Sequence, residues 1–259
     1  MSSSRPVGVL DSGIGGVTVM REARRLLPNE DYIFFSDSVN NPYGDKSDEE
    51  IISRCFEIAH LLIDIRGCKA LVLACNTASA KAADALRKKY KDTPVFAIEP
   101  AYKMVHDLNP EGFTLVLATR GTVNSEKFRR LYYRYYNHNT ALLACVGLAD
   151  LIEQDRAEEL KKYLEDTLGK YRGRVQNVVL GCTHYPIAKS DMREVLGDVN
   201  FFDGSLGISK RLRDILTEKE LLNDGGKQGK IIFIDSSPDK EMKKQKEERF
   251  FSILNEETL

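Results

Sequence analysis

Short apolar runs alternate along the chain with longer segments in which apolar residues recur every three or four positions. The short runs predict strands at residues 7–10, 32–35, 70–74, 95–98, 114–117, 141–145, 177–180, 199–202 and 230–234. The longer segments predict helices at residues 16–27, 48–66, 78–90, 125–136, 157–168, 188–196, 205–222 and 239–254. Strands that alternate with helices in this way form parallel sheets with helices on both faces. The pattern therefore predicts an α/β fold.

The sequence contains an internal repeat around two of its cysteines. Residues 70–77 and 177–184 each combine an apolar strand, a small residue, a cysteine and then hydroxyl or amide side chains. The same offset of 107 residues places 9–12 onto 116–119. Chance similarity between two buried strands would explain the apolar letters, but it is a weaker explanation of the matching polar endings. The repeat indicates the duplication of one α/β unit.

No Gly/Ser-rich or Pro-rich linker separates the two halves. Helix formation is interrupted at Glu99 and Pro100, and a second crossing is expected near residues 204–209. The C-terminal helices then return to the first half. The sequence therefore predicts a first α/β domain made of 1–98 plus 208–259 and a second made of 99–207.

Composition and charge narrow the class of protein. Of the 259 residues 42% are hydrophobic, and the net charge of −1 gives nucleic acid or anionic lipid no global attraction. No apolar run approaches the ~20 residues that a membrane span needs, and residues 1–6 lack the apolar core of a secretory signal. Five cysteines in a chain of this size indicate free thiols in a reducing compartment. We therefore expect no nucleic-acid partner, no membrane insertion and no disulfide scaffold.

The candidate chemistry lies where strands end, because ligands of open α/β sheets bind beyond the carboxyl ends of the strands. This rule brings four polar loops around one crevice, at 11–12, 42–44, 75–77 and 182–184. Each half then contributes one thiol. A reaction that inverts a carbon centre needs a base on one face and an acid on the other, and a thiolate and a thiol suit this task. With each sulfur about 3–3.5 Å from the carbon, the two sulfurs are too far apart to form a disulfide.

Two neighbouring side chains are candidates to exchange protons with the cysteines. We expect Asp11 beside Cys75 and His184 beside Cys182. Each of these two residues also has a possible structural role. Asp11 is also suited to be a structural carboxylate in the turn that follows it, and His184 to make a structural hydrogen bond. A lone cysteine at the end of an apolar strand is more often a small buried hydrophobe, as we expect for Cys55, Cys68 and Cys145.

Other interpretations are weaker. The loop 11–16 lacks the spacing and the lysine of nucleotide-binding loops, so its glycines are expected to permit a tight turn or the close approach of a small ligand. A zinc site at Cys182 and His184 has no C-x-x-C motif or histidine cluster to support it. Residues 240–249 are predicted to form a solvated helix face. Residues 129–136 mix basic and aromatic side chains, which helical packing explains better than nucleic-acid binding.

Four motifs resemble glutamate racemase in their order and spacing. They are Asp-Ser-Gly-Ile-Gly-Gly at 11–16, Pro-Tyr-Gly at 42–44, Ala-Cys-Asn-Thr-Ala at 74–78 and Gly-Cys-Thr-His-Tyr-Pro at 181–186. The resemblance runs from about residue 7 to 222. It implies two similar Rossmann-like, flavodoxin-like domains in a pseudo-symmetric arrangement, with the active site between them. It also implies racemisation of L-glutamate to D-glutamate for peptidoglycan, without pyridoxal phosphate, another cofactor or a metal.

The resemblance also implies roles for individual residues. Cys75 would act on D-glutamate and Cys182 on L-glutamate. The assisting residues would be Asp11, Glu153 and His184. The substrate contacts would come from Asp11, Ser12, Tyr43, Gly44, Asn76, Thr77, Thr183 and His184. Members of the family commonly form homodimers in the bacterial cytoplasm.

Some positions depart from the family pattern. The loop before Pro42 is usually Gly-Asp-Thr-x-Arg, but residues 36–40 are Ser-Asp-Ser-Val-Asn. A proline-rich run is replaced at 145–150, which makes the assignment of Glu153 less direct, and residues 202–206 are also unusual. These departures leave two alternatives open: a racemase of aspartate or another small amino acid, and a non-catalytic regulator that binds a carboxylate. The regulator would have no need of two thiols.

Overall fold

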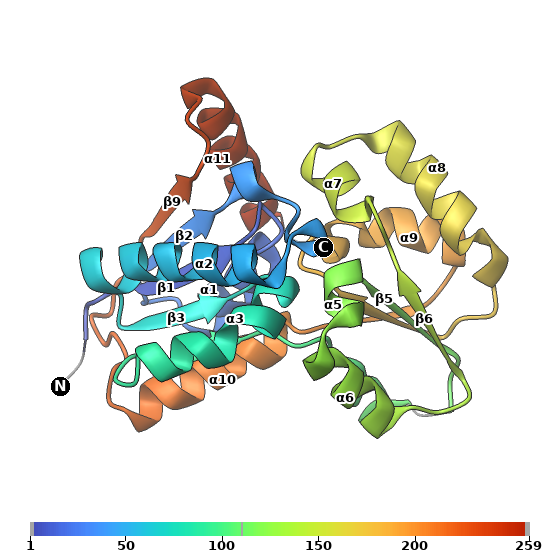
Figure 1. The fold of residues 1–259 in the computed structure, drawn as a ribbon, viewed down its shortest axis with the longest axis horizontal. Coiled ribbons are helices and arrows are strands. Elements are labelled where there is room, and N and C mark those ends of the chain that lie inside the picture. The colour runs from blue at the N-terminus through green and yellow to red at the C-terminus, as the bar shows by residue number, and fades with distance from the viewer. Residues whose placement is uncertain (1–2, 110, 257–259) are drawn as a thin grey trace.

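The computed structural model describes residues 3–109 and 111–256, whose strands form two separate parallel sheets (Figure 1). The first sheet has the order β4 (Val95–Ala97), β3 (Ala70–Leu73), β1 (Val7–Asp11), β2 (Tyr32–Ser36), β9 (Ile231–Asp235). The second has the order β6 (Thr140–Ala144), β5 (Thr114–Ala118), β7 (Asn177–Gly181), β8 (Asn200–Asp203). Met1 and Ser2, part of the start predicted to lack a secretory signal, lie outside the described residues.

The two sheets repeat one topology. The order β4-β3-β1-β2 in the first sheet corresponds to β8-β7-β5-β6 in the second, and β1 and β5 are 107 residues apart. The first sheet adds β9 at its edge, paired with β2. Each predicted strand is present and every pairing is parallel. The predicted α/β fold with two similar halves is therefore confirmed.

Helices cover the sheets, and most of them lie where the periodic segments predict them. They are α1 (Val17–Leu26), α2 (Asp48–Ala59), α3 (Asn76–Lys89), α4 (Tyr102–Leu108), α5 (Arg120–Asn124), α6 (Glu126–Tyr135), α7 (Leu148–Glu153), α8 (Ala157–Leu168), α9 (Lys189–Leu196), α10 (Ser205–Glu218) and α11 (Lys240–Asn255). A π-helical turn, η3 (His60–Ile65), continues α2. The prediction missed α4, α5 and α7, because segments of five to seven residues are too short to display a helical period.

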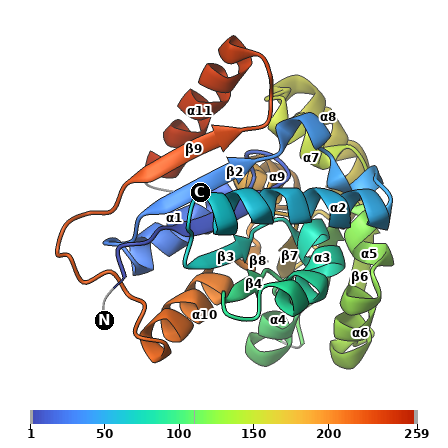
Figure 2. The same ribbon diagram turned by 60° about the vertical axis from the view of Figure 1, so that its left-hand side comes forward.

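After β8 the chain returns to the first half. Ile208, Leu212 and Leu216 of α10 pack in the same core as Val9 and Phe34 of the first sheet, as predicted. Figure 2 shows α10 and the β9–α11 unit beside the strands of that sheet. The domain limits at 98/99 and 207/208 stay a prediction.

The aromatic segment at the end of α6 packs as expected. Phe128 is buried, and Tyr132 and Tyr135 pack against the same cluster, whereas Tyr133 is exposed. All five cysteines are free thiols with buried side chains. Among the described residues, no helix is both long enough and apolar enough to span a membrane.

Candidate active site

Two cysteines stand at corresponding strand ends, one in each half. Cys75 follows β3 and occupies the N-cap position of α3. Cys182 follows β7 and comes just before a short 3₁₀ helix, η5 (Tyr185–Ala188). The cysteines are 6% and 7% exposed and belong to the cores of different halves. The duplicated strand thus places one thiol from each half near their common boundary.

Asp11 ends β1 and joins the two halves. Its Oδ1 accepts a 3.0 Å hydrogen bond from the backbone N–H of Gly13, and its Oδ2 accepts one of 3.0 Å from the Thr183 hydroxyl of the second half. Burial raises the pKa of Asp11 to about 6, although His184 and these hydrogen bonds oppose the change. Asp11 therefore combines the structural role with a carboxyl group that titrates near neutral pH.

Cys75 is held as a thiol by its surroundings. Burial raises the pKa of Cys75 to about 12, and the negative charge of Asp11 acts in the same direction. Hydrogen bonds from the backbone of Ala78 and the hydroxyl of Ser12 favour the thiolate, but they do not outweigh burial. Cys75 is therefore set to give a proton rather than to take one.

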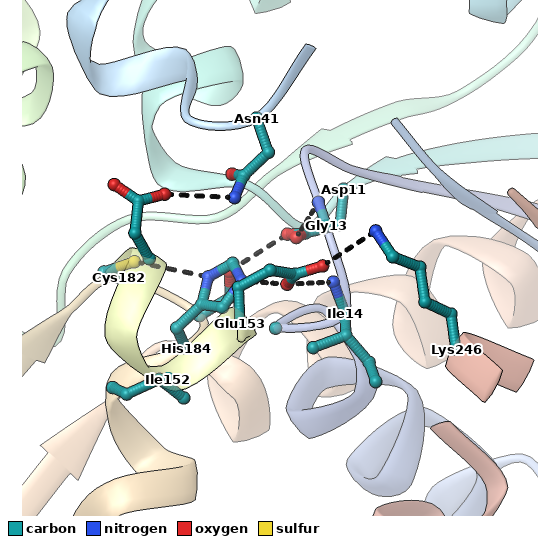
Figure 3. Close-up of polar contacts among 12 residues, drawn as sticks. Asp11, Gly13, Ile14, Asn41, Ile152, Glu153, Cys182, His184 and Lys246 are labelled. Atoms are coloured by element: carbon teal, nitrogen blue, oxygen red, sulfur yellow. Dashed lines mark hydrogen bonds and ion pairs between the residues drawn. The ribbon is translucent and has the colours of Figure 1, made fainter. Parts of the chain in front are cut away.

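Cys182 lies at one end of a polar chain that Figure 3 shows in full. Its sulfur is 3.7 Å from Nδ1 of His184, and Nε2 of His184 is 2.7 Å from Oε2 of Glu153. Burial alone would lower the pKa of His184, but hydrogen bonds to Cys182 and Glu153 raise it well above its ordinary value. Burial alone would raise the pKa of Glu153, but His184 lowers it to about 2. The pair is therefore an imidazolium and a carboxylate, and the imidazolium can donate to the sulfur.

The glycine-rich loop after Asp11 packs closely against the Glu153–His184 pair. A methyl group added at Gly13 would lie 2.5 Å from Oε2 of Glu153, and one added at Gly15 would lie 2.5 Å from Nδ1 of His184. The backbone N–H of Ile14 also donates a 2.8 Å hydrogen bond to Oε2 of Glu153. The close approach that these glycines permit is to side chains of the second half.

The remaining predicted contacts line the boundary between the halves. Asn76 presents a buried Oδ1 with no hydrogen-bond partner among the described residues, so this acceptor is open to a ligand. The Thr77 hydroxyl lies 3.1 Å from that of Thr119 in the second half. Tyr43 is buried and its hydroxyl donates to Asp37 at 2.6 Å, which leaves its backbone and that of Gly44 as the groups this turn can offer.

Sequence reasoning missed several residues that the structure brings to the site. Thr119 occupies the position of Ser12 under the 107-residue offset, so the repeat could have pointed to it. Lys246 and Arg249 contact Glu153 from α11, so the prediction that 240–249 form only a solvated face is wrong for these two residues. Their side chains span the boundary between the halves, which the local pattern of charges does not reveal.

The described residues offer no metal centre, and a cavity found at the chain crossing is not lined by the two thiols. Within the described part of the chain, no group of three or more His, Cys, Asp or Glu side chains could hold a metal ion. A cavity of about 820 Å³ lies where the chain crosses between the halves, and Glu99, Asp203 and Ile208 are among its lining residues. None of the predicted site residues lines this cavity.

Known proteins share this fold and sequence. The profile of the Asp/Glu/hydantoin racemase family matches residues 7–206. Glutamate racemase of Clostridium botulinum is 42% identical over 92% of this chain and 94% of its own length. The chain belongs to the glutamate racemase family. The resemblance carried by the four motifs is thereby confirmed.

Solved structures of glutamate racemases extend the comparison. That of Francisella tularensis in complex with D-glutamate has a TM-score of 0.79 and 32% identity, covering 96% of this chain and 94% of that one. That of Escherichia coli in complex with L-glutamate and the activator UDP-MurNAc-ala has a TM-score of 0.81 and 31% identity, covering 95% of each chain. These glutamate racemases share the two-domain α/β architecture described above.

Proposed function

We propose that the protein interconverts L-glutamate and D-glutamate by proton transfer between the substrate Cα and two thiols, without a cofactor. The observation that carries the proposal is the placement of Cys75 and Cys182 at the ends of β3 and β7, corresponding strands of two similar halves. A substrate held between the halves meets one sulfur on each face. The relatives named for this activity support glutamate as the substrate.

In the L-to-D direction, Cys182 acts as the base and Cys75 as the acid. The Cys182 thiolate removes the Cα proton, the electron pair of the C–H bond stays on the substrate, and the Cys75 thiol delivers its proton to the opposite face. The turnover ends with a Cys182 thiol and a Cys75 thiolate, ready for D-glutamate. His184 lies 3.7 Å from Cys182, and Asp11 acts on Cys75 by its charge, so each thiol has a neighbouring titratable group with which it can exchange a proton.

The substrate contacts follow from the groups that this boundary leaves available. Asn76 offers an unpartnered carbonyl oxygen that suits the substrate ammonium group. The N-terminus of α3 and the backbone of Tyr43 and Gly44 suit a carboxylate. The hydroxyls of Ser12, Thr77 and Thr183 complete the polar set.

Solvent isotope exchange tests the reaction. L-glutamate incubated with the reduced protein in deuterated water is expected to yield D-glutamate that carries deuterium at Cα. Cys75→Ser and Cys182→Ser are each expected to lower kcat by about 10²–10⁴-fold, whereas Cys68→Ala, another buried cysteine, retains activity. Glutamate binding with no isotope exchange would point instead to a regulator. Values of kcat/KM for glutamate and aspartate measured side by side decide substrate preference.

The cellular setting is part of the proposal. We expect a homodimer in the bacterial cytoplasm that supplies D-glutamate for peptidoglycan. Light scattering at micromolar concentration tests the dimer. Depletion of the protein in its host, with growth restored by added D-glutamate, tests the supply role.

A further inference from the structure

Among the described residues of the second half, the β9–α11 unit has no counterpart. The described strands of the second sheet end at β6, which corresponds to β2, whereas the first sheet adds β9 beside β2. The family match covers residues 7–206, so α11 lies beyond it. Phe250, Ile253 and Leu254 of α11 are buried in the core of the first half. The C-terminal part of α11 is therefore anchored in the core of the first half.

Two cations of α11 reach across to α7 of the second half. Nζ of Lys246 lies 3.5 Å from Oε1 of Glu153. Arg249 donates to the backbone carbonyl of Ile152 at 2.6 Å and also to that of Glu153. These carbonyls belong to the last turn of α7, where the partial negative charge of the helix end favours a cation. Both side chains are about three-quarters buried, so solvent screens these contacts only in part.

The other face of Glu153 is occupied by the active site. Oε2 accepts from the backbone of Ile14 and from His184, while Oε1 faces Lys246, as Figure 3 shows. Because Glu153 is the group that holds His184 on Cys182, α11 acts on the imidazole through a single carboxylate.

We propose that α11 is a strap that positions the Glu153–His184 pair, with Arg249 fixing the end of α7 and Lys246 holding the Glu153 carboxylate in both charge states of His184. The inference rests on the proposed function only in taking Cys182 as an acid and base. When a proton passes from Nδ1 of His184 to the sulfur of Cys182, the imidazolium becomes neutral and the thiolate becomes a thiol. Glu153 then keeps Lys246 as its cationic partner. Lys246 and Arg249 are positioning residues, because they touch Glu153 and not the reacting atoms.

The charges around the Glu153–His184 pair determine how the loss of Lys246 should change the proton affinity of His184. The groups that face it are Lys246 and Arg249 from α11, Asp11 from β1, Asp150 from α7, Asp155 beyond α7 and Cys182 from the loop after β7. Glu153 raises the proton affinity of His184, and the positive charge of Lys246 opposes that increase. Without Lys246 the imidazole should hold its proton more tightly and release it to Cys182 less readily.

The test compares Lys246→Met with Lys244→Met. Lys244 lies on the same helix, is 67% exposed and is 3.9 Å from Glu248, so it is a matched control. Lys246→Met is expected to lower kcat by about tenfold, to move the basic limb of the kcat/KM profile to higher pH and to raise the His184 titration midpoint. Lys246→Arg should restore all three. The midpoint is read by NMR without substrate, with the His184 signal identified from a His184→Gln variant.

The outcomes separate the strap from the proposed function. If wild-type protein shows no isotope exchange with glutamate, the proposed function fails, yet the His184 midpoint still reports on the strap. The strap is refuted if Lys246→Met leaves that midpoint where it is in wild type, even when the melting temperature falls, or if Lys244→Met has the same effect. Should Lys246→Met fold poorly, Lys246→Gln serves the same comparison.

Discussion

Arg54 donates two hydrogen bonds of 2.9 Å, from Nε and Nη2, to the two carboxylate oxygens of Asp37. Asp37 is fully buried and also accepts from the hydroxyl of Tyr43 and the amide of Asn40. Burial alone would raise the pKa of Asp37, but these hydrogen bonds, those of Arg54 above all, lower it. One guanidinium in α2 thus fixes the loop that presents Tyr43 and Gly44 to the site.

Removal of this guanidinium should weaken both the fold and substrate binding. Arg54→Gln leaves the Asp37 charge buried without its cation, and loss of one partner of a buried pair costs about 3–5 kcal/mol. Because Arg54 is 28% exposed and partly screened by solvent, we expect a smaller loss of about 2–3 kcal/mol. The KM for glutamate should rise several-fold, with a smaller fall in kcat. Urea unfolding and steady-state kinetics measure the two effects.

A second substitution can separate charge from position. The family loop usually carries arginine where this chain has Asn40, so Asn40→Arg introduces a guanidinium on the loop itself. In the Arg54→Gln background this change should recover most of the lost stability and KM. Arg25→Gln removes an exposed arginine paired with Glu22 and should change neither quantity. Failure of the double variant to recover KM would show that α2, rather than any nearby cation, sets the loop.

Asp11→Asn should stabilise the protein and impair the reaction. The pKa of Asp11 rises from its ordinary 3.8 to about 6 on folding, so the stability from its protonated form is lost as pH rises through 6. The shift corresponds to about 3 kcal/mol at about 1.4 kcal/mol per pKa unit. The variant should therefore exceed wild type in stability at pH 8 and approach it below pH 4. Its kcat should fall about 10–100-fold because Cys75 loses a proton acceptor.

Urea unfolding of both proteins between pH 4 and pH 8 checks the stability of Asp11→Asn. Asp84→Asn, an exposed carboxylate beside Arg87, provides the control and should show no such pH dependence. Equal stability of wild type and Asp11→Asn at pH 8 would contradict the burial of an ionised carboxylate at this position.

Glu153→Gln should destabilise the fold in a defined pH window. The stability contributed by Glu153 is lost as pH falls from 4.5 toward about 2, and that of His184 is lost as pH rises through its elevated pKa. Both contributions are complete between about pH 4.5 and 6.5, so the variant should lose most there, about 3–5 kcal/mol. Thermal melts across this range measure it, and a loss independent of pH would contradict the ion pair. We expect kcat to fall about 10²-fold.

Sequence periodicity predicts the framework because parallel strands such as β1 and β7 are apolar throughout and the helices between them have one apolar face. The repeat around Cys75 and Cys182 also predicts that the thiols stand at equivalent strand ends. Periodicity does not predict α7, since six residues do not complete two helical turns. The position of Glu153 therefore had to come from family resemblance, and only the structure shows it against His184.

Contacts between side chains far apart in the sequence are the other feature that the sequence pattern does not predict. Arg54 lies among the polar positions of an amphipathic helix, and Lys246 lies in a run of mixed charges; both patterns are typical of a solvated helix face. What distinguishes them is the buried carboxylate opposite, on Asp37 in one case and Glu153 in the other. The partner of Arg54 lies 17 residues away, and the partner of Lys246 lies in the other half of the molecule. The residue pattern of a single segment therefore identifies neither of these partners.

Gly15 offers the sharpest steric test of the boundary between the halves. A methyl group there would lie 2.5 Å from Nδ1 and 2.7 Å from the backbone nitrogen of His184, closer than real contacts allow. The imidazole would have to leave the position from which it faces Cys182. Gly15→Ala should therefore lower kcat by about 10²-fold or more, because misplacing a catalytic group by ~1 Å costs about that factor. Gly207→Ala adds the same methyl group inside α10, where no described atom beyond the helix's own backbone lies within 4 Å. It should stabilise the fold by about 0.5–1 kcal/mol with unchanged kinetics. Kinetics and melting temperatures of the two variants, measured together, check both expectations. If Gly15→Ala kept near wild-type kcat, the tight packing of this loop against His184 would not be needed for catalysis.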